Sequence, residues 1–209
     1  MKDAQGGPAY GRTNWRRFAV AAVVPVAAAG ALVVGMANGA FAASFTVSGQ
    51  SFKISADKLE GTGFAQYGDK DTTANGTDIP VAVSGISSAK LYNLCQSVKM
   101  PGLPVSLTIR AGREAGKPAE ATDLLIGMSE LSGDAEFTSI NIGQDASTLG
   151  LGGKDAKGKA GTFGQEAKGV TITDLRQIST STSAGTFKLK GLSLKVNGPG
   201  ADGKPAECF

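Results

Sequence analysis

The 209-residue chain contains no histidine, and aromatic residues make up only 6% of it. A serine nucleophile usually needs a histidine to accept its proton, so a Ser-His-Asp triad is excluded. Neither a Gly-x-Ser-x-Gly nucleophile motif nor a P-loop occurs in the sequence. Imidazole is also a common metal ligand. We therefore expect no metal site and no cofactor.

Three weak signals of chemistry remain. Ser55 and Lys58 form an S-x-x-K pattern, but Lys58 is better interpreted as a solvated residue at a strand end. Asp69, Asp71 and Asn75-Gly76 depart from the spacing of a calcium loop, so that interpretation is rejected. The third signal is a group of carboxylates, which suits acid–base catalysis if it is buried and a solvated acidic edge if it is not. Its members are Asp123, Glu130, Asp134 and Glu136.

The first 42 residues have the order of a secretory signal peptide. A basic patch at Arg12, Arg16 and Arg17 precedes an apolar run over residues 18–34. The run ends in an A-x-A pattern, which places cleavage after Ala40 and Ala42 and before Ala43. We expect a signal helix over residues 1–42 and one extracytoplasmic domain over 43–209. An uncleaved membrane anchor is the alternative, since the run approaches the length that spans a bilayer.

Removal of the signal segment changes the charge of the protein. Residues 1–42 hold four basic residues and one acidic residue, so residues 43–209 carry 17 of each sign. Nucleic-acid binding requires a surplus of positive charge on one surface. With no net charge in the mature chain, no nucleic-acid partner is expected.

Two cysteines, Cys95 and Cys208, are present. Outside the cytoplasm, two cysteines in one domain usually form a disulfide. This bond would fasten the end of the chain to the segment around residues 91–98. A free thiol and a metal site are the alternatives, but two thiols without histidine do not supply four zinc ligands.

The sequence of the mature chain predicts strands separated by turns that contain glycine, proline, asparagine and aspartate. Apolar and polar residues alternate over 79–83, 105–110 and 170–173, a period typical of strands with one buried face. The alternation changes phase at Gly49 and Gly191, which indicates bulges or tight turns.

The predicted fold is therefore all-β, an antiparallel sandwich or an elongated curved sheet, with a β-helix as the alternative. Residues 111–120 and 150–161 are expected to be surface loops. Only residues 123–131 offer a short helix.

The chain resembles a family of small exported actinobacterial proteins without an established molecular role, some of whose members carry the label cholesterol esterase. The segments that carry the resemblance are ASF at 43–45, VSGQ at 47–50, KLEGTGF at 58–64, LYNLCQS at 91–97, LSGDA at 131–135, DASTL at 145–149, TSAGTF at 182–187 and ECF at 207–209. The resemblance implies an extracytoplasmic protein beside an integral membrane partner. The label implies a sterol or lipid ester substrate.

Three functions compete at this point. The first is a non-catalytic protein of the cell envelope that binds a lipid or another apolar partner on its β face. The second is an esterase for sterol or lipid esters, which would need a serine–carboxylate or serine–lysine site because histidine is absent. The third is a structural or assembly protein of the cell surface, in which sheets of neighbouring copies pair.

Overall fold

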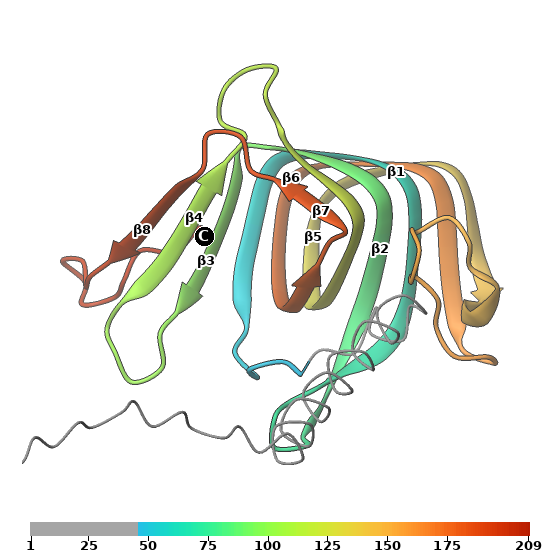
Figure 1. Ribbon diagram of the computed structural model, residues 1–209, viewed down its shortest axis with the longest axis horizontal. Helices are drawn as coiled ribbons and strands as arrows, with labels where there is room; N and C mark the ends of the chain where they lie inside the picture. The colour runs from blue at the N-terminus through green and yellow to red at the C-terminus, as the bar shows by residue number, and fades with distance from the viewer. Residues whose placement is uncertain (1–45) are drawn as a thin grey trace, which may run out of the picture. The chain divides into compact units, whose positions relative to one another are not determined.

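Residues 46–209, the part of the chain that the computed structural model describes, form one antiparallel sheet of eight strands (Figure 1). The strands are β1 (Phe52–Thr72), β2 (Asp78–Tyr92), β3 (Leu94–Lys99), β4 (Ser106–Ala111), β5 (Ala119–Asp145), β6 (Phe163–Ser183), β7 (Thr186–Lys188) and β8 (Ser193–Asn197). A short 3-10 helix, Ala146–Thr148, follows β5.

The prediction of an all-β fold is confirmed, and the curved antiparallel sheet is the form found. The β-helix alternative is wrong because all the strand pairs of the sheet are antiparallel. The short helix considered over residues 123–131 is also wrong, since this segment lies within β5. The predicted signal helix and the cleavage site at Ala40, Ala42 and Ala43 lie outside the described residues.

Four of the strands close into a ring. β1 pairs with β2 along one edge and with β6 along the other. β5 pairs with β2 through residues 119–128 and with β6 through residues 125–145. The strands curve around a common interior, as Figure 1 shows for β1, β2, β5 and β6. We call these four strands the ring.

Three of the ring strands, β1, β5 and β6, change the phase of their buried face at a residue with positive φ. In β1 the buried apolar positions change from odd-numbered Leu59 to even-numbered Phe64, and Gly63, with a φ of +68°, lies between them. β5 and β6 change phase in the same way at Asp123 and Asp174, whose φ values are 47° and 52°. Glycine adopts this left-handed conformation freely, and aspartate tolerates it better than most residues.

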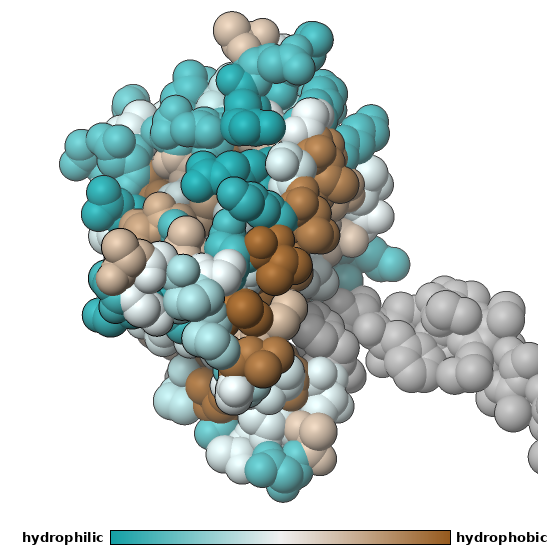
Figure 2. All heavy atoms as spheres, turned by 90° about the vertical axis from the view of Figure 1, so that its left-hand side faces the viewer, coloured by the Kyte–Doolittle hydropathy of each residue, from teal (hydrophilic) through white to brown (hydrophobic). Residues whose placement is uncertain are grey.

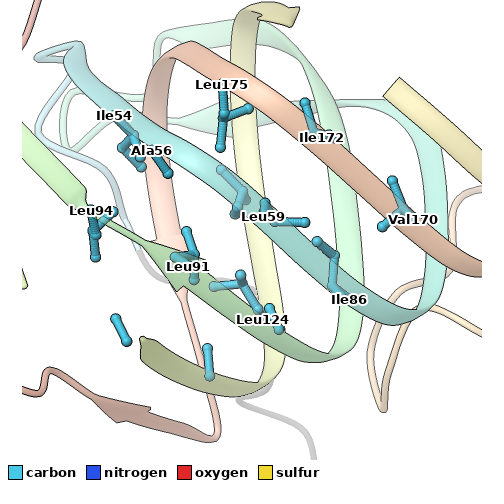
Figure 3. Close-up of a cluster of buried hydrophobic side chains, with 14 of the residues drawn as sticks. Ile54, Ala56, Leu59, Ile86, Leu91, Leu94, Leu124, Val170, Ile172 and Leu175 are labelled. Atoms are coloured by element: carbon cyan, nitrogen blue, oxygen red, sulfur yellow. The ribbon is translucent and has the colours of Figure 1, made fainter. Parts of the chain in front are cut away.

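The interior of the ring is a tightly filled apolar core (Figure 3). Side chains from β1, β2, β5 and β6 point toward one another, and Leu59, Leu124 and Leu175 are each 2% exposed. Leu94 of β3 also belongs to this cluster. Close packing of this kind provides the main stabilisation of the fold.

A second apolar cluster lies on the outer side of β1 and β2. Tyr67, Val81 and Val83 are covered there by Leu149 and Ala156 from the segment after β5. Residues 150–161, predicted as a surface loop, are therefore a loop that also covers part of the sheet. Burial raises the pKa of Tyr67 to about 12, with a further contribution from the negative charges of Asp69 and Asp155.

Candidate functional site

Three strands extend the sheet beyond the ring. β3 pairs with the first residues of β1, β4 pairs with β3, and β8 pairs with β4. These strands lie together on the left of Figure 1. We call β3, β4 and β8 the wing. One face of the wing is polar and the other is apolar.

The polar face of the wing is buried under the last segment of the chain. Ser97, Ser106 and Thr108 are only 1%, 0% and 7% exposed. The Ser97 hydroxyl oxygen accepts a hydrogen bond from the backbone N–H of Cys208 at 3.0 Å, and the Ser106 hydroxyl donates to the carbonyl oxygen of Ala206. Residues 198–209, which we call the tail, therefore satisfy polar groups that a bare sheet would leave to solvent.

A disulfide and an ion-pair cluster fix the tail in place. Cys95 of β3 is joined to Cys208 across 113 residues of sequence, with a Cα–Cα distance of 5.8 Å. Glu207 lies 2.7 Å from Lys99 Nζ and 3.3 Å from Lys53 Nζ. Burial works to raise the pKa of Glu207, but hydrogen bonds from the two lysines outweigh it and lower this pKa below its usual value. The carboxylate is thus held in its charged form.

The apolar face of the wing has no such cover from the described residues. Leu194 is 60% exposed, and Leu192 and Val196 are each 56% exposed. Figure 2, which views the side of the molecule that β8 occupies, shows a band of hydrophobic atoms between hydrophilic ones. The register places Leu194 beside Ile109 and Val196 beside Leu107. The apolar side chains of neighbouring strands therefore form one continuous surface.

This arrangement reverses one expectation from the sequence. The alternation over residues 105–110 predicts that Leu107 and Ile109 are buried and that Ser106 and Thr108 face solvent. In the structure, Ser106 and Thr108 are buried and the two apolar residues are only half-buried. The reason is that the tail packs on the polar side of β4.

The apolar face continues into the ring where β3 pairs with β1, and a narrow slot opens there. Its cavity volume is about 20 Å³, room for one water-sized group. Phe187 of β7 lines it, and so does Thr182, whose buried Oγ1 makes no hydrogen bond to other described residues. The slot is lined by Ile54, Leu59, Leu91, Leu94, Gln96, Leu124, Ile126, Leu175, Gln177, Thr182 and Phe187.

The S-x-x-K pattern does not form a catalytic pair. Lys58 Nζ lies 2.7 Å from Glu60 Oε1 and sits over the ring of Tyr92. The hydrogen bond to Glu60 raises the pKa of Lys58, so the amine keeps its proton and is a poor general base. Ser55 faces a polar hollow beside the Cys95–Cys208 disulfide, and no hydrogen bond between Ser55 and Lys58 is found in residues 46–209.

The four acidic residues that the sequence suggested for acid–base catalysis are not buried either. Glu130, Asp134 and Glu136 are exposed on the second half of β5, which pairs with β6 on one side only. Asp123 lies at a separate bend, where its carboxylate accepts a hydrogen bond from the backbone N–H of Lys154 at 3.2 Å. The interpretation as a solvated acidic edge fits this placement, because charges on an unpaired strand edge hinder pairing with other sheets.

Within residues 46–209, no group of three or more cysteine, aspartate or glutamate residues is arranged to hold a metal ion. Of the calcium-loop candidates, Asp71 accepts a hydrogen bond from the Thr180 hydroxyl and Asp69 lies 3.8 Å from Lys159. No helix in this range has the length and hydrophobicity needed to cross a membrane.

One sequence pattern points to the exposed surface. Leu192, Leu194 and Val196 alternate in a strand close to the end of the chain, while the tail after it has few apolar residues. A strand at the edge of a sheet keeps its apolar face open unless another segment packs on it. No such segment does so among residues 46–209.

Comparison with known proteins gives one match. A family model described as a family of unknown function (DUF6230) matches residues 48–209. No curated protein matches the chain, and no solved structure does.

Proposed function

Because the chain belongs to the DUF6230 family, whose function is unknown, we propose its function from the wing: it is an exported, non-catalytic protein of the cell envelope that binds a lipid or another apolar partner. The observation that carries the proposal is the exposure of Leu192, Leu194 and Val196 on a face without charged residues. Covering such side chains contributes roughly 1 kcal/mol or more each.

The disulfide supports the extracytoplasmic part of this proposal. Disulfides persist in oxidising compartments and are rare in the cytosol. The Cys95–Cys208 bond fixes the tail that buries the polar side of the wing. The signal peptide expected over residues 1–42 would deliver the chain to such a compartment.

Ester hydrolysis has less support. The sequence lacks histidine, and Lys58 is paired with Glu60. The slot beside the wing holds about 20 Å³. A sterol or lipid ester needs a larger enclosed site, since pockets for small molecules usually measure about 300–1,000 Å³. Surface binding is consistent with these features, whereas hydrolysis of a sterol or lipid ester inside this slot is not.

The wing would accept two kinds of partner. One is a lipid, free or in a membrane. The other is an integral membrane protein that presents an apolar segment at the membrane surface. Both would cover the same residues, so a surface variant tests the site before the partner is known.

The test measures binding of the neutral fluorescent probe N-phenyl-1-naphthylamine and flotation with phosphatidylcholine vesicles. Leu194→Glu should abolish probe binding, because a carboxylate would then lie in the centre of the apolar face. Lys195→Glu is the matched control, since Lys195 is next in sequence but lies beside Thr108 on the polar side of β8. Its probe binding should match that of the wild type. Absence of both probe binding and flotation in the wild-type protein would refute the proposed function.

A further inference from the structure

The size of the apolar face limits what can cover it. The wing has three strands of five or six residues. At about 3.3 Å per residue and 4.8 Å between strands, its face measures roughly 300 Å². A stable protein–protein interface needs about 800 Å² on each partner. The face is therefore too small to hold a second copy of this chain firmly, but it is large enough for one small apolar molecule.

The chemistry of the face limits the ligand further. Its rows, read across β3, β4 and β8, are Gln96–Ile109–Leu194 and Val98–Leu107–Val196. Neither row contains a charged residue. Neither contains tyrosine or tryptophan, the residues that commonly anchor proteins at a bilayer surface. An ionised head group placed here would lose its hydration without gaining a counter-charge.

The slot at the ring supplies the polar contact. Ile54 pairs with Gln96, and both residues line the slot. The row that contains Leu194 therefore leads directly into it. Inside are the Gln177 side chain and Thr182, whose buried hydroxyl lacks a hydrogen-bond partner among the described residues. A small uncharged polar group would fit there, because the slot is water-sized.

We infer that the wing binds a single hydrocarbon chain with an uncharged hydrogen-bonding end. The chain lies along the row from Leu194 to Gln96, and the polar end enters the slot and hydrogen-bonds Thr182. This inference rests on the proposed function and specifies its ligand class. It distinguishes a neutral chain from a fatty acid anion, from a bilayer surface and from a second copy of the protein.

The experiment is displacement of bound N-phenyl-1-naphthylamine at pH 8 by dodecanol, dodecanoate or dodecane. Dodecanoate is ionised at this pH. We expect dodecanol to displace the probe at a concentration at least about tenfold lower than dodecanoate, because the carboxylate would lose its hydration in the slot. Thr182→Val keeps the side-chain volume but removes the hydroxyl. In this variant the concentration of dodecanol that displaces the probe should come to within about threefold of that of dodecane. Lys195→Glu should leave the displacing concentrations of dodecanol, dodecanoate and dodecane unchanged.

Several results would overturn the inference while leaving the proposed function intact. One is probe binding that requires Leu194 but is displaced best by dodecanoate. A second is that dodecanol displaces the probe from the Thr182→Val variant as well as from the wild type. A third is that vesicles displace the probe and none of the three compounds does. A dimer in light scattering that Leu194→Glu dissociates would assign the face to a second copy and would overturn the proposed function as well. Absence of any probe binding would instead remove both the inference and the proposed function.

Discussion

The ring and the wing belong to one sheet but are stabilised in opposite ways. In the ring, apolar side chains such as Leu59 and Leu124 fill a closed interior. In the wing, the buried side is polar, and hydrogen bonds, a disulfide and an ion-pair cluster hold it against the tail. The wing thus buries its polar side, while Leu194 and Val196 on its apolar side remain exposed.

This comparison predicts the largest effect for a substitution inside the ring. Leu124→Ala should lower the free energy of unfolding by about 3–4 kcal/mol, since a fully buried leucine leaves a cavity. Leu194→Ala, the same change on the wing, should cost less than about 0.5 kcal/mol, because this side chain is 60% exposed. Urea denaturation measures both. Equal losses in the two variants would contradict the division into a ring that needs its apolar core and a wing that does not.

Removing the disulfide tests how the wing is held. Cys95→Ser with Cys208→Ser should lower the free energy of unfolding by about 2–4 kcal/mol, because the bond closes a very long loop. Limited proteolysis should then cut residues 198–209 first and leave the ring intact. A tail that stays protected without the disulfide would mean that the hydrogen bonds of Ser97 and Ser106 suffice.

The ring was easier to predict from the sequence than the wing. Val170 and Ile172 alternate with polar residues and are buried, as expected for a strand with one face on a core. The same logic failed for Leu107 and Ile109, because alternation shows that a strand has two different faces but not which of them is covered. Coverage depended on the tail, a distant segment of the chain.

The phase changes in the alternation were also only partly predictable from the sequence. Gly49 and Gly191 mark turns with positive φ, as their position between two apolar phases suggested. The bends at Asp123 and Asp174 were missed, because aspartate is far less diagnostic of a left-handed conformation than glycine. The closure of the ring could not be predicted, since it depends on pairing between β1 and β6, which are about a hundred residues apart.

High pH should weaken the outer cover of the ring. The pKa of Tyr67 is raised to about 12 in the folded protein, whereas in the unfolded chain it is near 10. The folded state therefore binds more protons between these values, so the free energy of unfolding falls as pH rises from about 10 to 12, by at most about 2–3 kcal/mol. Tyr67→Phe should remove this part of the pH dependence in denaturation experiments. An unchanged slope would show that other groups cause it.

The smallest predicted effect concerns the ion-pair cluster of the wing. Glu207→Gln should lower the free energy of unfolding by about 0.5–1 kcal/mol at neutral pH, because Lys53 and Lys99 lose their shared carboxylate. The pKa of Glu207 is lowered in the folded state, so its contribution is present above the unfolded value near 4.5 and is lost as pH falls through the folded value. The wild type and the variant should therefore become equally stable in acid. Lys204→Gln, in the same tail but outside this cluster, is the control. If the Glu207 variant remains less stable in acid by the same amount, the carboxylate acts through packing, and the wing depends on its tail for contact and not for charge.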